Sequence, residues 1–181
     1  MLDTTATLLQ RQGYHATGLN QIVAESGSPK GSMYFHFPGG KEQLAAEAIE
    51  LAGRRIVDAL HHHSRESALA SLDSYLAWLA RWLERTHFEQ GCPIATVALE
   101  VGPTSALVGQ ACADAFDRLE GAVVEWLRAD GYEEAHARDR AVLIYAAIEG
   151  ALVLAKGRRS TEPLHRLRAA LPQLLGDSAS T

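Results

Sequence analysis

Apolar residues recur at helical spacing along nearly the whole chain, and this periodicity constrains the fold more than any other feature. Leu2, Ala6 and Leu9 mark one apolar helical face near the N-terminus. A wider stripe begins near residue 69 and contains Leu72, Leu76, Leu79 and Leu83. No run of alternating β-branched residues is long enough to predict a strand. We therefore expect an all-α protein with about nine helices.

Glycines and prolines divide the N-terminal part of the chain into three short helices. The second ends near Gly27, and Ser28 with Pro29 begins the third as its N-cap and first-turn proline. After the Pro-Gly-Gly run at 38–40, a longer connector helix is expected over about 41–63. Two short helices joined by a glycine turn form the helix-turn-helix layout, in which the second helix enters the DNA major groove.

The rest of the chain predicts a larger helical domain. Further helices are expected from residue 69, over 91–100, 105–130 and 133–156, and from Thr161 onward. We place a helix-turn-helix domain at 1–44, a helical ligand-binding and dimerisation domain at 45–176 and a flexible tail at 177–181.

Composition excludes several other classes of protein. The 181 residues are 47% hydrophobic and carry a formal net charge of -5, so any nucleic-acid contact must be local. Two cysteines, Cys92 and Cys112, predict neither a disulfide framework nor a zinc site. The sequence has no membrane span and no secretory signal pattern. We expect a cytoplasmic protein that has no membrane partner.

The segment GYHATGLNQIVAESGSPKGSMYFHFPGGKEQL, residues 13–44, resembles the DNA-binding half of the TetR family of bacterial repressors. The family has a Thr before the first helix of the motif, two apolar residues and an Ala within it, and a Gly at the turn. A Leu-Tyr-x-(Tyr or His)-Phe run and a Lys follow. These places are filled here by Thr17, Ile22-Val23-Ala24, Gly27, Met33-Tyr34-Phe35-His36-Phe37 and Lys41.

This resemblance assigns roles to individual side chains. It implies that phosphates are bound by Thr17, Tyr34, His36 and Lys41. It places Asn20, Lys30, Gly31, Ser32 and Phe35 against the bases. Met33 and Phe37 are then core residues. The chemistry agrees, because small residues let the backbone approach the duplex, a lysine can bind phosphate or guanine, and a phenyl ring can contact a thymine methyl group.

Two departures from the family pattern concern the DNA contacts. Family members usually carry a basic arm before the first helix, whereas this sequence begins almost inside that helix. We expect either a start further upstream or lower DNA affinity. The turn at 38–40 is one residue longer than the commonest form, which displaces Lys41 slightly.

The C-terminal part loosely resembles the LmrA and YxaF-like branch of the family, in the segments GCPIATVALE and IEGALVLAKGRRSTEPLHRL. The resemblance implies an effector pocket among variable helices and two final helices that form a homodimer. Dimer symmetry suits a palindromic operator in double-stranded DNA. The apolar residues expected at the dimer interface are Ile148, Leu152, Leu164, Leu167 and Leu171.

Several residues are candidates for binding a small effector, and each has a plainer interpretation. Aromatic residues at helical spacing, including Trp126, either line a pocket for a flat apolar ligand or are ordinary core. Carboxylates in apolar helices either meet a ligand or are solvated or paired. A cysteine at a helix start is either redox-sensitive or simply a small buried residue. The ligand-binding candidates are Trp78, Trp82, Cys92, Glu100, Phe116, Tyr145 and Glu149.

Metal and catalytic motifs are weaker. The run at 61–63, His-His-His, is interpreted as a solvated helix end, because successive helical residues point about 100° apart. Glu84, Glu133 and Glu162 each precede a His by three residues, a spacing found in di-iron bundles but also in helix caps. No nucleophile motif, phosphate loop or dinucleotide fingerprint is present.

The sequence therefore predicts a ligand-responsive transcriptional repressor that has no cofactor and no catalytic residues. Two alternatives stay open at this point. One is a metal-dependent helical oxidase that uses two of the Glu-x-x-His pairs. The other is a helical ligand-binding protein that has lost DNA binding.

Overall fold

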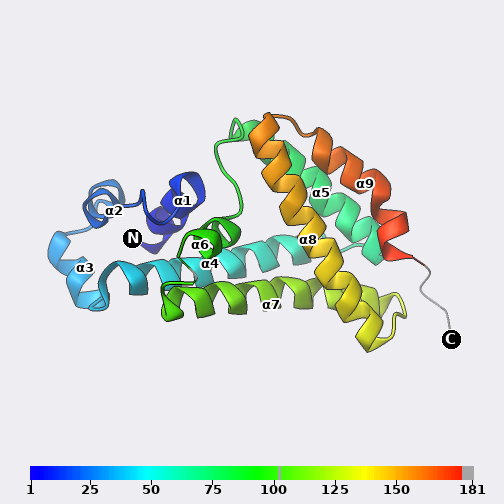
Figure 1. Ribbon diagram of the computed structural model, residues 1–181, viewed down its shortest axis with the longest axis horizontal. Coiled ribbons are helices and arrows are strands. Elements are labelled where there is room, and N and C mark those ends of the chain that lie inside the picture. Colours follow the sequence, from blue (N-terminus) through cyan, green and yellow to red (C-terminus); the bar gives the residue numbers. More distant parts are fainter. Residues whose placement is uncertain (102, 177–181) are drawn as a thin grey trace. The chain divides into compact units, whose positions relative to one another are not determined.

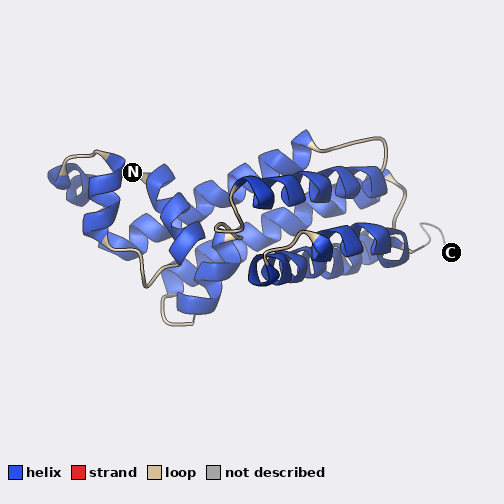
Figure 2. Cartoon of the chain, turned by 90° about the horizontal axis from the view of Figure 1, so that it is seen from above, coloured by secondary structure: helices blue, strands red, loops and turns tan. Residues whose placement is uncertain are grey.

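The computed structural model describes residues 1–101 and 103–176, and every regular element in these ranges is a helix (Figures 1 and 2). The helices are α1 (Leu2–Gln12), α2 (Leu19–Ser26), α3 (Lys30–His36), α4 (Gly40–His62), α5 (Ala68–Arg85), α6 (Pro93–Val101), α7 (Ala106–Ala129), α8 (Glu134–Arg158) and α9 (Glu162–Leu175). The predicted all-α fold of about nine helices is confirmed. The predicted flexible tail, 177–181, lies outside the described residues.

The chain forms two compact units, and neither is continuous in sequence. The first contains residues 1–55 and 92–116, so α6 and the start of α7 belong to the same unit as α1, α2 and α3. The second contains residues 56–91 and those from 117 onward, with α5, α8 and α9. Helices α4 and α7 each contribute to both units. The predicted domain boundary after residue 44 stays a prediction.

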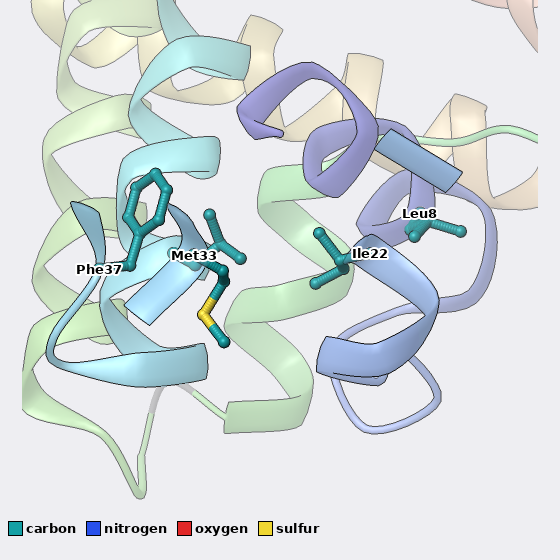
Figure 3. Close-up of a cluster of buried hydrophobic side chains, with 5 residues drawn as sticks. Leu8, Ile22, Met33 and Phe37 are labelled. Atoms are coloured by element: carbon teal, nitrogen blue, oxygen red, sulfur yellow. The ribbon is translucent and has the colours of Figure 1, made fainter. Parts of the chain in front are cut away.

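A small hydrophobic core holds the three N-terminal helices together. It consists of the buried residues Leu8, Ile22, Met33, Phe37 and Leu44 (Figure 3). Helices α1, α2, α3 and α4 contribute one residue each, and Phe37 comes from the segment directly after α3. Met33 is 1% exposed and Phe37 is 8% exposed. The prediction that both are core residues is confirmed. Because Met33 packs one side of α3 into this core, the opposite side of this short helix faces solvent.

Helix α9 holds the second unit together by packing against both α5 and α8. Its apolar side is buried at Leu164 and Leu171. Its polar side is tied to α5 by Arg168, whose Nε and Nη2 each donate to a different carboxylate oxygen of Asp73 at 2.8 Å. This two-bond contact holds the pKa of Asp73 below its ordinary value, mainly through the hydrogen bond from Arg168.

Side chains cap two of the helices in this unit. Ser67 precedes α5, and its hydroxyl accepts the backbone N–H of Ala70. Glu133 precedes α8, and its carboxylate accepts the N–H groups of Ala135 and His136. The spacing of Glu133 and His136 therefore reflects helix capping. No helix in the described parts of the chain is long and apolar enough to cross a membrane.

Candidate DNA-binding site

The turn between α2 and α3 depends on Gly27. This residue has φ 64° and ψ 11°, the left-handed conformation that glycine adopts without steric cost, and it ends α2. The prediction that Ser28 is the N-cap of the next helix is wrong. Pro29 occupies the N-cap position, and no side chain caps α3. The chain is extended at Pro29, so the helix starts one residue later than predicted. Ser28 therefore lies before the N-cap position, and its backbone N–H donates to the Ser26 hydroxyl at 3.4 Å.

Helix α3 exposes two aromatic side chains beside a lysine. Phe35 is 80% exposed and Tyr34 is 55% exposed, and Lys30 and Gly31 are exposed with them. These four residues form the recognition face of α3. An aromatic ring that remains in water forfeits a large hydrophobic stabilisation, so an exposed aromatic cluster next to a cation indicates a binding surface.

The remaining predicted DNA contacts lie around this face. Asn20 in α2 and His36 at the end of α3 are exposed, and Ser32 is half-buried. Thr17 differs, because it is 1% exposed and its hydroxyl donates to the Gly13 carbonyl at 2.6 Å. In this structure the Thr17 side chain stabilises the turn before α2. Its role as a phosphate ligand stays a prediction.

Lys41, at the start of α4, lies against a buried tyrosine. Its Nζ is 4.1 Å from the centroid of the Tyr14 ring, a cation–π distance. Burial lowers the pKa of Lys41, and the negative charge of Glu100 opposes that shift. Lys41 is therefore a half-buried cation held at the edge of the N-terminal helices rather than a freely solvated one.

The turn after α1 is held by Glu100, which the sequence analysis predicted to be a ligand contact. The Glu100 Oε2 atom, on α6, accepts the backbone N–H of His15 at 2.9 Å. The same carboxylate lies directly against Gly13, which ends α1 with φ 78° and ψ -175°. No local pattern could have revealed this contact, since its partners are 85 residues apart. The role of Glu100 as a ligand contact stays a prediction.

Family models match both parts of the chain. Residues 1–48 match the model described as bacterial regulatory proteins, tetR family, and residues 68–170 match the LmrA/YxaF-like C-terminal domain of transcriptional regulators. The HTH-type transcriptional regulator LmrA of Bacillus subtilis is 35% identical over 179 residues, 97% of this chain and 94% of that protein. The chain belongs to the TetR family. It is a helix-turn-helix transcriptional regulator and not an enzyme.

Other members of the TetR family are similarly related. An uncharacterized HTH-type transcriptional regulator, Rv0196 of Mycobacterium tuberculosis, is 35% identical over 97% of this chain and 92% of its own length. Among solved structures, the regulatory protein TetR from Rhodobacter sphaeroides superposes with a TM-score of 0.84 at 20% identity, covering 96% of this chain and 95% of that chain. At that identity the superposition supports the fold alone.

The metal-site alternative finds no support in the structure of this TetR-family member. Residues 1–101 and 103–176 contain no group of three or more His, Cys, Asp or Glu side chains that could hold a metal ion. Glu133 caps α8, and Glu162 pairs with Arg158 and Arg166. Glu84 accepts the Thr161 hydroxyl at 3.4 Å. Helix capping and surface pairing occupy these carboxylates.

Two predicted ligand contacts belong to an aromatic row on α5. Trp78 and Trp82 are half-buried and stacked, with ring centroids 6.3 Å apart and planes 14° apart. Tyr75 stacks on Trp78 at 5.7 Å, and His63 lies 5.7 Å from the same indole ring. Contact with an effector stays a prediction for both tryptophans.

The interpretation of residues 61–63 as a solvated helix end is wrong for the third histidine. His61 and His62 are exposed, whereas His63 is 8% exposed and its Nδ1 lies 2.9 Å from the Ser74 hydroxyl. The reason is the rotation of about 100° per residue, which turns this third ring toward α5. Burial lowers the pKa of His63, and the charges of His62, Arg65 and Arg81 lower it further.

This environment predicts that low pH destabilises the protein through His63. The folded state holds its pKa below the ordinary 6.5, so the stabilising effect is fully present above that value and is lost as pH falls through the folded-state pKa. Urea unfolding followed by tryptophan fluorescence should give a lower free energy of unfolding at pH 5.5 than at pH 7.5. His63→Asn should flatten this difference, and His165→Asn, which changes an exposed histidine on α9 that does not act on His63, should keep it. An unchanged pH profile in His63→Asn contradicts the prediction.

The other ligand-binding candidates lie in varied surroundings. Tyr145 on α8 is 4% exposed, while Phe116 on α7, Glu149 on α8 and Cys92 are half-buried. The Cys92 Sγ atom accepts the N–H of Ala95 at 3.5 Å, as a residue preceding a helix does. Burial raises the pKa of the other cysteine, Cys112, to about 11, so its thiol stays protonated at neutral pH.

The residues predicted to form the dimer interface are largely buried within the single chain. Ile148, Leu152, Leu164 and Leu171 are each less than 8% exposed, and Leu167 is half-buried. They belong to α8 and α9, which pack against each other, and α9 also packs against α5. Their contribution to a dimer stays a prediction. The apolar side chains that α8 leaves exposed are Val142, Leu143, Val153 and Leu154.

Proposed function

We propose that this TetR-family regulator is a repressor that binds a palindromic DNA operator as a homodimer and is released by a small effector. The observation that carries the DNA contact is the recognition face of α3, where Phe35 is 80% and Tyr34 is 55% exposed beside Lys30. Met33 anchors the other side of the same helix in the core. A short helix fixed in this way presents its outer side to the major groove.

Each side chain of this face suits a different part of the duplex. Lys30 can neutralise a phosphate or donate to a guanine edge, and the Tyr34 hydroxyl can donate to a phosphate oxygen. Gly31 has no side chain, and no atom lies within 4 Å of where its Cβ would be, so the backbone can approach the bases there. Phe35 supplies apolar contact to thymine methyl groups.

The exposed side of α8 supports the homodimer. Val142, Leu143, Val153 and Leu154 fall on one side of the helix, and the exposed small residues between them are Ala146 and Gly150. Small residues let two helices approach closely, and a contiguous apolar helical face in water indicates a protein partner. A second copy of the chain supplies the same face and is self-complementary under two-fold symmetry.

Charge on this α8 face is expected to abolish the dimer. The double variant Leu143→Glu, Val153→Glu buries two carboxylates per protomer in the proposed interface and should raise the dissociation constant at least about 100-fold. Sedimentation equilibrium at micromolar concentration measures the shift to monomer. Leu69→Glu is the matched control, because Leu69 is an exposed leucine, 38% exposed, on a different helix, at the start of α5. A double variant that remains dimeric contradicts the proposed interface.

The effector is proposed to act through populations of conformations. A ligand that binds better to a form with wrongly spaced recognition helices lowers operator affinity by its differential binding free energy. A small, largely apolar or aromatic molecule is favoured by the half-buried rings of Trp78 and Trp82. Such a regulator acts on DNA inside the cell, so we place it in the cytoplasm.

Selection of bound duplexes from a random DNA pool tests the proposal. The purified chain should enrich a palindrome whose half-sites lie about one helical turn, or a multiple of it, apart. The double variant Lys30→Ala, Tyr34→Ala should lose affinity for that duplex by at least tenfold, because it removes phosphate contacts in both protomers. The control variant Glu50→Gln, which removes a charge on α4 rather than on α3, should bind the duplex as the wild type does.

The possible outcomes separate the two functions considered for this chain. Enrichment of a palindrome whose binding weakens steeply with salt supports the repressor. Failure to enrich any sequence, with or without a basic extension added to the N-terminus, overturns it and favours a ligand-binding protein without DNA binding. Enrichment of a non-palindromic site overturns the symmetric dimer on the operator.

A further inference from the structure

The Glu100 carboxylate contacts the turn after α1 at two residues, Gly13 and His15. It accepts the His15 N–H at 2.9 Å, and a Cβ built on Gly13 would lie 1.8 Å from its Oε1 atom. Helix α6 packs on α1, so Glu100 reaches this turn from a helix outside the helix-turn-helix. The carboxylate therefore both accepts a hydrogen bond from this turn and fills the space beside Gly13 that a side chain would otherwise occupy.

Lys41 also lies against this turn, at Tyr14. Its Nζ lies over the ring of Tyr14, and Tyr14 stands between the two residues that contact Glu100, Gly13 and His15. The charge of Glu100 acts on Lys41 and favours its protonated form. The family pattern implies that Lys41 is a phosphate ligand, so the charge of Glu100 and a DNA phosphate would act on the same cation.

We propose that Glu100 is a positioning residue for the DNA contact, holding the turn after α1 through His15 and competing with an operator phosphate for Lys41. This inference rests on the proposed DNA-binding function. The hydrogen bond fixes where Tyr14, and with it Lys41, stands relative to the recognition helix. The charge lowers the free energy that Lys41 gains by pairing with phosphate, because part of its field is already neutralised.

The two roles of Glu100 respond differently to substitution. Glu100→Gln removes the charge and keeps an oxygen that accepts the His15 N–H, whereas Glu100→Ala removes both. Amide hydrogen exchange at His15 should therefore stay slow in Glu100→Gln and become faster in Glu100→Ala. If Glu100 only held the turn through its hydrogen bond, the exchange pattern would be the same, but the pKa of Lys41 would not change in Glu100→Gln.

The ionic behaviour of Lys41 can be measured without DNA. The chain has three lysines, Lys30, Lys41 and Lys156, so reductive methylation with ¹³C-formaldehyde gives a simple spectrum in which each dimethylated lysine keeps its charge. We expect the pKa of Lys41 to be lower in Glu100→Gln than in the wild type. Glu50→Gln, which removes a charge farther along α4 beside Arg54, should leave Lys41 unaffected. An unchanged pKa of Lys41 in Glu100→Gln overturns the inference.

The DNA arm uses the duplex enriched by selection. Glu100→Gln should bind it roughly 2- to 10-fold more tightly at low salt, with a steeper dependence of log K on log salt, by up to about 0.9 for each phosphate newly neutralised. Lys41→Ala should abolish this gain, since the charge acts through Lys41. Wild-type protein that binds no duplex overturns the proposed function. Wild-type binding with the same salt dependence in Glu100→Gln, or an equal gain in Glu50→Gln, overturns this inference alone.

Discussion

Met33→Ala is expected to destabilise the N-terminal helices by about 2–5 kcal/mol, the usual cost of removing a large buried side chain and leaving a cavity. Met33 is 1% exposed and packs with Leu8, Ile22, Phe37 and Leu44. It is the only residue of the seven in α3 that is buried, so the helix loses its main anchor. Operator affinity should fall with it, because the recognition face is then no longer held in one orientation.

Hydrogen exchange of peptides from α1 to α3 measures this loss where it arises, without requiring the whole chain to unfold in one step. Phe35→Ala is the matched control. It removes a larger side chain two residues along the same helix, but one that is 80% exposed, so stability should change by no more than about 0.5 kcal/mol. DNA binding should nevertheless weaken. Equal exchange in the two variants would contradict the division of α3 into an anchor and a recognition face.

That division of α3 could be predicted from the sequence, and the reason is local. At about 100° per residue, a helix turns Tyr34 and Phe35 to a different side from Met33 and Phe37. The family pattern then indicates which of these two sides belongs to the core. Helix number and type were predictable for the same reason. Helix ends were less so, because the start of α3 at Lys30 depends on the extended conformation of Pro29 and not on a capping side chain.

The contacts that could not be predicted join segments far apart in the chain. Glu100 meets His15 only because α6 folds back on α1, and His63 is buried only because α5 covers the end of α4. The residues of a dimer interface are difficult to predict for a different reason. A leucine series on α9 predicts an apolar seam but cannot tell whether α5 and α8 of the same chain or a second chain will cover it.

Gly13→Ala is expected to cost roughly 2–4 kcal/mol, for two reasons that act at one atom. Gly13 has φ 78° and ψ -175°, a backbone region that is essentially restricted to glycine and costs other residues about 1–3 kcal/mol. Its new Cβ would also stand 1.8 Å from the Glu100 Oε1 atom, so the end of this flexible side chain must shift, which disturbs its hydrogen bond from the His15 N–H. Thermal unfolding and hydrogen exchange of α1 should both report the loss.

A double-mutant cycle separates these two causes. In Gly13→Ala, Glu100→Ala the steric contact has no partner, so only the backbone cost and the lost hydrogen bond remain, and the two single changes should not add. A coupling of roughly 1 kcal/mol in the stabilising direction is expected. Gly31→Ala is the control, because it lies in α3 with open space around its Cβ position and should stabilise the helix by about 0.4–1 kcal/mol. Strict additivity in the cycle would mean that the Glu100 carboxylate does not rest on Gly13 in solution.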